Sequence, residues 1–241
     1  MTNIDLSPTR SAVRKAGSDL RKLILGRATD EPRYFEAIEV ITAWRASHQY
    51  PLMKATSGLR SMVQTVGADV IVSQRLKRVP TIIDKLIREP SIDSSRMQDY
   101  GGCRAVLSSI DEIRAVQSRL GKAHRERCGR DPHPIKDYVT RPKPSGYRGV
   151  HVVVNYNERL IEVQLRTRVM HEWAIAMETL SGRFKINLKA ADAPIALRNL
   201  YAEASRLMAL EETGASVEQV DLEHFAVLQE RAVEFLSSRE S

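Results

Sequence analysis

The spacing of apolar residues predicts alternating helices and strands along most of the chain. Apolar side chains recur at helical intervals in Tyr34–His48, Ala55–Val66, Pro80–Arg88, Ser109–Gly121, Arg168–Leu180, Pro194–Glu212 and Val217–Leu236. Short β-branched runs predict strands at Val70–Leu76, Gly102–Leu107, Gly149–Tyr156 and Arg159–Leu165. Asn157 and Glu158 separate the last two strands, which is the spacing of a β-hairpin. The pattern predicts an α/β fold with a mixed β-sheet flanked by helices, and with helical extensions at both ends.

Two parts of the chain are polar and are expected to lack regular structure. The first thirty residues are expected to be poorly ordered or loosely docked, because they mix charges with Ser and Thr. Gly121 is expected to end the helix that begins at Ser109, since glycine commonly terminates helices. The segment from Gly121 to Pro134 is then a polar connection. We see no clear linker, so the pattern favours one domain.

Composition excludes several classes of protein. The chain has 241 residues, of which 42% are hydrophobic and 28% charged, as in ordinary soluble globular proteins. Two cysteines exclude a disulfide scaffold and favour a reduced, cytoplasmic protein. No apolar run approaches the roughly 20 residues of a membrane span, and no apolar segment typical of a secretory signal lies near the N-terminus. We therefore expect no membrane partner.

The net charge of +7 is concentrated in one segment. Residues 114–148 contain ten Lys or Arg and three acidic residues, so they account for the whole formal excess. The end of this segment, from Lys136 to Arg148, combines cations with prolines, a glycine and two tyrosines, which is typical of an ordered loop rather than a helix. Such a loop can hold phosphates and bases together. The alternative is a solvated basic loop.

Two carboxylates on or beside predicted strands are candidates for metal binding. Alternation from Leu160 to Thr167 places Glu162, Gln164 and Arg166 on one face of a strand, either as a polar active-site floor or as an ordinary solvent-facing surface. Asp99 stands just before a strand and two glycines, where it either holds Mg²⁺ or orders the turn. Such a pair of carboxylates can hold Mg²⁺ against a polyphosphate.

A third cluster brings cations to the start of a predicted helix. Arg75 and Lys77 alternate at a strand end, and Thr81 and Lys85 lie four residues apart on one helical face. This arrangement suits a polyphosphate, although it matches neither a Walker loop nor a dinucleotide-binding fingerprint. The segment His171 to Glu178 lacks the spacing of a zinc protease and is interpreted as a structural helix.

Together and in this order, these clusters resemble the synthetase domain of the RelA/SpoT family, the alarmone synthetases. The resemblance covers roughly Val70 to Lys189. Its most specific segments are Lys136-Asp137-Tyr138, Pro142 to His151, Glu162 to Thr167 and His171 to Ala174. The resemblance implies a nucleotidyltransferase-like sheet and the transfer of pyrophosphate from ATP to a ribose 3′-hydroxyl. It also implies a synthetase domain at residues 51–190, between an N-terminal helical extension at 1–50 and C-terminal helices at 191–241.

The resemblance also implies roles for particular residues. The ATP and its phosphates would contact Arg75, Lys77, Thr81 and Lys85. Asp99 and Glu162 would be the catalytic residues and the Mg²⁺ ligands, with Glu162 either sharing the metal or accepting the hydroxyl proton. Tyr147 would stack on the acceptor base. The other acceptor-binding residues would be Lys143, Arg148, His151, Gln164 and Arg166.

Departures from the family pattern narrow the expected activity. Thr81 stands where a serine is usual, and Glu178 where many housekeeping members have a histidine. The chain contains no His-Asp dipeptide, so we expect a small synthetase without a hydrolase domain. Details including Trp44 to His48, Met97 to Arg104 and Ala176 to Glu178 look closer to the toxic small synthetases.

Three alternatives for the acceptor and the activity follow. The preferred one is the 3′-CCA end of tRNA, which would make the protein an inhibitor of translation with an antitoxin as a possible partner. The basic charge supports this acceptor, because lysine and arginine side chains bind the many phosphates of tRNA. The alternative is GDP or GTP, which would make the protein a (p)ppGpp synthetase. An inactive RNA-binding module is a remote third possibility, because Asp99, Glu162 and Tyr147 are all retained.

Overall fold

The computed structural model describes residues 7–27, 29–67, 70–132, 134–188 and 193–238. The expected boundary between residues 190 and 191 lies outside these ranges, and both expected domain boundaries stay predictions. The elements follow in chain order: α1 (Arg10–Ile24), α2 (Glu31–Ala46), α3 (Gln49–Gln64), β1 (Ile71–Leu76), α4 (Val79–Arg88), the 3₁₀ turn η1 (Ser94–Arg96), β2 (Gly101–Leu107), α5 (Ile110–Cys128), β3 (Ile135–Asp137), β4 (Val150–Tyr156), β5 (Arg159–Thr167), α6 (Arg168–Phe184), α7 (Ile195–Glu212) and α8 (Gln219–Ser237).

The chain divides into two compact units that interleave in sequence. Unit 1 comprises residues 1–105, 115–135 and 152–164, and unit 2 comprises residues 106–114, 136–151 and 165–241. Unit 1 therefore carries α1 to α4, β1 and the beginnings of β2 and β5. Unit 2 carries the loop that precedes β4 and the helices α6 to α8. None of the described helices combines the length and the apolar character that crossing a membrane requires.

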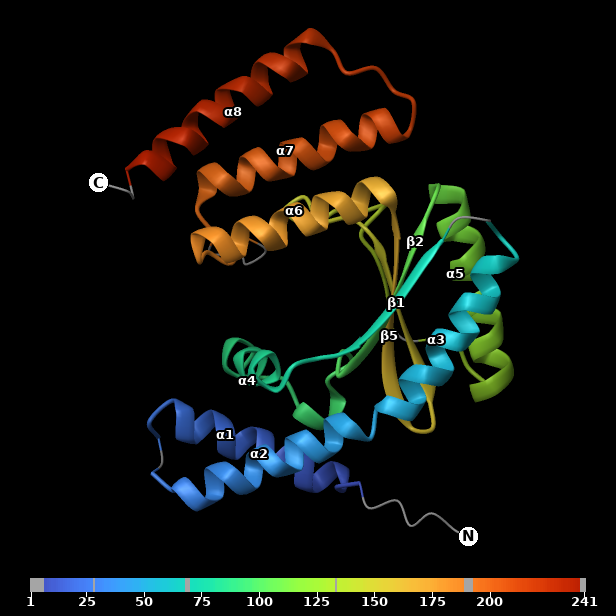
Figure 1. Cartoon of the computed structure of the whole chain (residues 1–241), viewed down its shortest axis with the longest axis vertical. Coiled ribbons are helices and arrows are strands. Elements are labelled where there is room, and N and C mark those ends of the chain that lie inside the picture. The colour runs from blue at the N-terminus through green and yellow to red at the C-terminus, as the bar shows by residue number, and fades with distance from the viewer. Residues whose placement is uncertain (1–6, 28, 68–69, 133, 189–192, 239–241) are drawn as a thin grey trace. The chain divides into compact units, whose positions relative to one another are not determined.

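The strands form the predicted mixed sheet, in the order β1-β2-β5-β4-β3. Alternation along β5 buries Ile161, Val163 and Leu165 completely, which confirms the predicted apolar face of that strand. Asn157 and Glu158 both have positive φ angles, as a two-residue hairpin turn between β4 and β5 requires. In unit 1, α3 packs beside β1 (Figure 1). The sheet and its flanking helices agree with the fold class predicted from the sequence.

The expectation of a poorly ordered N-terminus is wrong for the described residues. Thr9 caps α1 by accepting a hydrogen bond from the backbone N–H of Ala12 at 3.2 Å. The helix buries Val13, Ala16 and Leu20 in a core shared with α2 and α4. These three apolar residues lie at helical spacing between charged positions, and that narrow stripe is enough to dock the helix. The antiparallel pair of α1 and α2 is visible in Figure 1.

The expected helix end at Gly121 is also wrong, because α5 continues to Cys128. Val116, Leu120 and His124 are buried at intervals of four residues, so one face of the helix stays packed past the glycine. This packing outweighs the cost of about 1 kcal/mol for glycine in a helix interior. The helix ends instead at Gly129, which has a φ of 68°.

The helices α7 and α8 form an antiparallel hairpin in unit 2 (Figure 1). Arg206 of α7 joins the two helices, since it pairs with Glu203 at 2.6 Å and with Asp221 of α8 at 2.5 Å. The hairpin shares a buried cluster with α6 and with Tyr147 of the loop before β4. The C-terminal hairpin is thus packed onto the segment predicted to bind the acceptor.

Candidate active site

Three predicted site residues of unit 1 come together around one carboxylate, a group that we name the donor corner: Lys77, Lys85 and Asp99. The Lys77 Nζ lies 2.8 Å from Asp99 Oδ2, and the Lys85 Nζ lies 2.9 Å from Asp99 Oδ1. Lys77 follows β1, Lys85 lies in the last turn of α4, and Asp99 stands just before β2. The alternative in which Asp99 only orders its own turn does not describe these contacts.

The electrostatics of the donor corner favour an ionised Asp99. Partial burial alone would raise the pKa of this carboxyl, but the charges and hydrogen bonds of Lys77 and Lys85 outweigh that effect and lower the pKa. The Asp99 side chain keeps 21% of its surface exposed. An accessible carboxylate with a lowered pKa can bind a cation, and the two ammonium groups beside it can bind polyphosphate.

Glu162 lies on β5, the strand adjacent to β2 in the sheet. A Cβ atom placed on Gly102 would lie 3.5 Å from the backbone oxygen of Glu162, so these two residues face each other across the strands. The Gln164 Nε2 donates a hydrogen bond to Glu162 Oε2 at 2.7 Å. Glu162 and Gln164 are both half-buried on the same strand face. Gln164 therefore orients the Glu162 carboxylate, and the role of this strand face as an active-site floor stays a prediction.

The other two predicted ATP ligands of unit 1 are solvent-exposed. Arg75 is near the end of β1, and Thr81 lies in the first turn of α4, one helical turn before Lys85. Both positions are open to a ligand.

Unit 2 contains a second group of predicted residues, which we name the acceptor cluster: Lys143, Tyr147, His151 and Arg166. The hydroxyl of Tyr147 lies 2.5 Å from His151 Nε2 and accepts a hydrogen bond from Arg166 Nε at 3.2 Å. The Lys143 ammonium lies over the Tyr147 ring, 5.3 Å from its centroid. These four predicted acceptor ligands therefore share one location.

Tyr147 is more buried than a base-stacking role suggests. Only 5% of its surface is exposed, and its ring packs against Tyr138 and Trp173. Lys143 is exposed and lies over both Tyr138 and Tyr147. The stacking role of Tyr147 stays a prediction.

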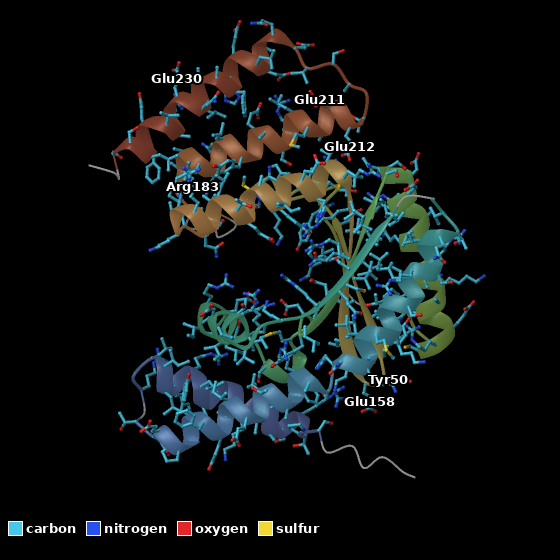
Figure 2. All side chains as sticks on the ribbon, in the orientation of Figure 1. Tyr50, Glu158, Arg183, Glu211, Glu212 and Glu230 are labelled. Atoms are coloured by element: carbon cyan, nitrogen blue, oxygen red, sulfur yellow. The ribbon has the colours of Figure 1, made fainter. Side chains whose placement is uncertain are left out.

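Arg148 turns into the body of unit 2 instead of lying open to a ligand. Its Nη1 lies 2.9 Å from Glu212 Oε2, and the two side chains are only 7% and 9% exposed. Glu212 is at the end of α7 (Figure 2). The acceptor-binding role of Arg148 stays a prediction, and in this structure its guanidinium forms an ion pair with Glu212.

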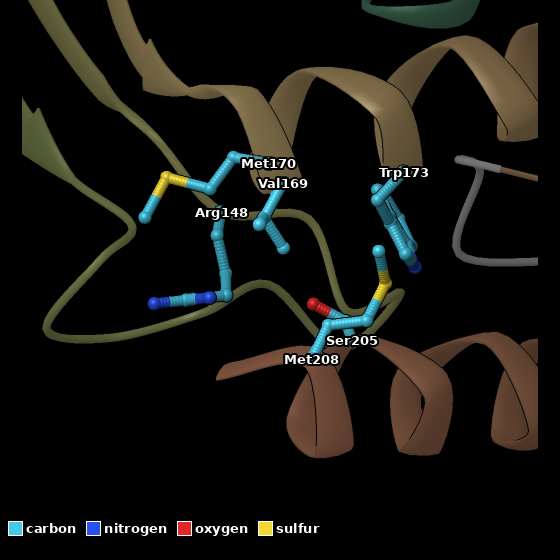
Figure 3. A pocket seen from close by; sticks show the side chains of 6 residues that line it. All are labelled: Arg148, Val169, Met170, Trp173, Ser205 and Met208. Carbon is cyan, nitrogen blue, oxygen red and sulfur yellow. The ribbon is translucent and has the colours of Figure 1, made fainter. Parts of the chain in front are cut away.

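A further contact ties the same loop to α7. The Ser205 hydroxyl donates a hydrogen bond to the carbonyl oxygen of Gly146 at 2.6 Å. Gly146 has a φ of 85°, and an added Cβ atom would lie 2.8 Å from the Cα of Ala202. Only glycine fits there without displacing the helix. Arg148 and Ser205 line a narrow crevice together with Val169, Met170, Trp173 and Met208 (Figure 3).

The donor set of unit 1 is compatible with Mg²⁺. No group of three His, Cys, Asp or Glu side chains that could hold a metal exists among the residues with described positions. Magnesium does not require one, because it commonly uses one or two carboxylates together with water and substrate phosphates. The accessible Asp99 and the half-buried Glu162 satisfy this requirement.

Comparisons with known proteins identify the family. Residues 74–183 match the model described as "Region found in RelA / SpoT proteins". The GTP pyrophosphokinase YjbM of Bacillus subtilis is 31% identical over 146 residues, which cover 56% of this chain and 67% of YjbM. The chain belongs to the RelA/SpoT family. The resemblance seen in the sequence is thereby confirmed.

Two further matches show how much of this RelA/SpoT chain its relatives cover. The small alarmone synthetase 1 of Bacillus subtilis, solved bound to its product pppGpp, superposes with a TM-score of 0.58. It is 23% identical, and the match covers 69% of this chain and 90% of that one, so it supports the fold. An uncharacterised protein of Mycobacterium tuberculosis is 27% identical over 186 residues. These residues are 77% of this chain and 63% of the mycobacterial protein.

The sequence analysis missed one candidate residue of this RelA/SpoT site. Arg104 lies two positions after Gly102 on β2, so the two residues share one face of that strand. It is half-buried, and its guanidinium is a positive charge on the strand adjacent to the one that carries Glu162. The alternation of Gly102, Arg104 and Val106 was the available signal, since a cation on an otherwise apolar strand requires a polar partner.

Proposed function

We propose that this protein transfers the β,γ-pyrophosphate group of ATP to the ribose 3′-hydroxyl of GDP or GTP. The observation that carries the proposal is the donor corner, in which two ammonium groups share one ionised carboxylate in a RelA/SpoT chain. Pyrophosphate transfer needs charge neutralisation and placement more than covalent assistance. The related YjbM is a GTP pyrophosphokinase, which supports the same acceptor here.

The donor side of the reaction rests on cations. Lys77 and Lys85 would contact the phosphates of ATP, and the exposed Arg75 and Thr81 would extend this surface. Mg²⁺ held by Asp99 and Glu162 would neutralise charge on the phosphate oxygens. Each ammonium group has three donors, so a lysine can contact a phosphate oxygen and still lie near Asp99.

The acceptor side supplies orientation and a proton acceptor. The 3′-oxygen forms a bond to the β-phosphorus, the bond between that phosphorus and the α,β-bridging oxygen breaks, and AMP leaves with the bridging oxygen. Glu162, oriented by Gln164 at 2.7 Å, would accept the hydroxyl proton unless the metal occupies it. Tyr147 and Lys143 would position the base, with His151 and Arg166 holding the tyrosine hydroxyl.

The guanine-nucleotide acceptor is better supported than the tRNA end that we preferred from the sequence. The comparisons name a GTP pyrophosphokinase and a pppGpp-bound synthetase. The structure also weakens the charge argument for tRNA. Within the basic segment 114–148, Arg114 pairs with Asp137, Arg125 with Asp131 and Arg148 with Glu212. An antitoxin partner was expected only together with the tRNA acceptor.

One assay decides between the acceptors. Purified protein, Mg²⁺ and ATP labelled at the γ-phosphate are incubated with GDP, GTP or deacylated tRNA in parallel. We expect label on GDP or GTP, strict dependence on Mg²⁺, and none with an Asp99→Asn variant. Label on tRNA alone would contradict the proposed acceptor, and label on no acceptor would contradict the proposed activity. ATP, GDP and GTP are cytoplasmic metabolites, so we propose that the protein acts in the cytoplasm.

A further inference from the structure

The end of α2 contacts the donor corner through the backbone of Lys77. The Arg45 Nε donates a hydrogen bond to the carbonyl oxygen of Lys77 at 2.6 Å, across 32 residues of sequence. The N–H of the same residue donates to the carbonyl oxygen of Tyr100 at 2.8 Å. Both polar groups of the Lys77 main chain are therefore fixed, one by Tyr100, the residue before β2, and one by Arg45.

The residues that directly follow α2 contact Tyr100, the residue after Asp99. Tyr100 is completely buried, and its ring stacks on the His48 ring at a centroid distance of 5.1 Å. His48 is fixed in turn by a contact of 2.8 Å between its Nδ1 and the carbonyl oxygen of Trp44. Arg45 of α2 therefore contacts Lys77, and His48, two residues after the end of that helix, contacts the neighbour of Asp99.

The end of α2 is anchored on β5, the strand that carries Glu162. The Arg159 guanidinium lies over the Trp44 ring, 4.2 Å from its centroid, and its Nε donates to the Ser47 hydroxyl at 2.8 Å. Trp44 is only 3% exposed. These contacts fix the residues on either side of Arg45, and so they fix the position from which Arg45 donates to the Lys77 carbonyl oxygen.

From these contacts we infer that Arg45 is a positioning residue for ATP binding, acting through the main chain of Lys77. A side chain as long as lysine can place its ammonium group on Asp99 in many ways, and fixing its backbone removes part of that freedom. The inference rests on the proposed function, in which Lys77 contacts the phosphates of ATP. It assigns to the N-terminal helices a part in binding the donor and none in binding the acceptor.

The test compares Arg45→Gln with a matched control on the same helix. Arg33 of α2 pairs with Asp19 of α1 at 2.9 Å, so Arg33→Gln also removes a guanidinium contact in unit 1 without touching Lys77. Binding of a non-hydrolysable ATP analogue with Mg²⁺ is measured by calorimetry, and KM is measured for ATP and for GDP. Thermal unfolding reports the stability of each variant.

We expect Arg45→Gln to weaken ATP-analogue binding about 10-fold, as loss of a hydrogen bond from a charged donor implies. The KM for ATP should rise to the same extent, while the KM for GDP stays within about twofold. Arg33→Gln should lower the unfolding temperature without changing analogue binding. Arg45→Lys should restore part of the affinity, because an ammonium group can donate to the same carbonyl.

Two results would overturn the inference. One is unchanged analogue binding by folded Arg45→Gln, and the other is an equal loss of binding by Arg33→Gln. The proposed function fails separately, if the wild-type protein binds the analogue but labels neither GDP nor GTP. In that case a 10-fold loss of binding in Arg45→Gln would still support the positioning role.

Discussion

In the donor corner three charged side chains remain partly exposed, whereas the region predicted to bind the acceptor buries its tyrosine and one arginine. Lys77 and Lys85 satisfy Asp99 at the surface, so an incoming phosphate or metal can exchange for these contacts. Arg148 is instead neutralised by Glu212 inside unit 2, and Tyr147 is packed between other rings. The charges are therefore accessible to a ligand in one region, whereas in the other they hold the shape of a loop.

The largest expected effect comes from removing the charge that the donor corner shares. Asp99→Asn should lower the rate of pyrophosphate transfer about 10²- to 10³-fold, because two ammonium groups and Mg²⁺ lose their common carboxylate. The labelled-ATP assay measures this loss, and thermal unfolding checks that the variant is folded. A folded Asp99→Asn protein with a near-normal rate would place the catalytic carboxylate elsewhere.

The second prediction contrasts one ion pair from each region. Glu212→Gln should destabilise the protein by about 3–5 kcal/mol, because it leaves the buried Arg148 guanidinium without its counter-charge. Lys85→Met should cost about 1 kcal/mol or less, since Asp99 is accessible and keeps Lys77. Chemical denaturation measures both free energies of unfolding.

Activity should show the opposite order for these two variants. Lys85→Met should lose most of its transfer rate, whereas folded Glu212→Gln should keep its KM for ATP and change mainly its KM for the acceptor. Glu211→Gln, at the neighbouring position of α7, makes the same change of charge and serves as the control for Glu212→Gln. Equal stability losses in Glu212→Gln and Lys85→Met would remove the distinction between the two regions.

The third prediction concerns acid stability near the donor corner. Burial lowers the pKa of His48 from 6.5 to about 4, with the charge of Arg159 acting in the same direction and the hydrogen bond to Trp44 opposing it. The unfolded chain takes up this proton first, so the stability that neutral His48 provides is lost as the pH falls from about 6.5 to about 4. The loss reaches about 3 kcal/mol across that window.

Denaturation of the wild-type protein and of His48→Gln at several pH values isolates this contribution. The difference between their free energies of unfolding should shrink as the pH falls through the window, because only the wild-type protein carries the histidine penalty. A difference that is independent of pH between 4 and 6.5 would contradict the assignment of a buried neutral imidazole.

The sequence predicted the donor corner well, because its members are local signals. Lys77 and Lys85 lie at strand and helix positions that alternation and periodicity define, and Asp99 precedes two glycines at a strand start. Their assignment to ATP and metal came from the family resemblance. What the pattern could not supply was Arg45, because its contact with Lys77 crosses 32 residues and joins two elements by a main-chain carbonyl.

The residues of the acceptor cluster were named from the sequence, but their burial was not predicted. Tyr147 and His151 were named from the sequence, yet the burial of the ring depends on Trp173 and on the distant α7–α8 hairpin. The pairing of Arg148 with Glu212 joins two residues of unit 2 that are far apart in the sequence, so no local pattern connects them. The N-terminal helix α1 was missed for a related reason. Its narrow apolar stripe is buried by residues of α2 and α4 that are distant in the sequence.

The smallest expected effect tests whether α7 shapes the acceptor loop. Ser205→Ala removes the hydrogen bond to the Gly146 carbonyl, which should cost about 1 kcal/mol and raise the acceptor KM about fivefold. Ser238→Ala is the matched control, because its hydroxyl also donates to a main-chain carbonyl of unit 2, that of Phe235, but at an exposed helix end.

In Ser238→Ala both the stability and the acceptor KM should stay near the wild-type values. The KM for ATP should be unchanged in both variants, since the donor corner does not contain this hydrogen bond. A Ser205→Ala variant that loses stability but keeps its acceptor KM would show that the contact only fastens α7. Because Gly146 leaves no room for a Cβ atom against Ala202, the loop has little freedom to compensate. A change in the acceptor KM without a change in the ATP KM would therefore show that the C-terminal hairpin shapes the acceptor site.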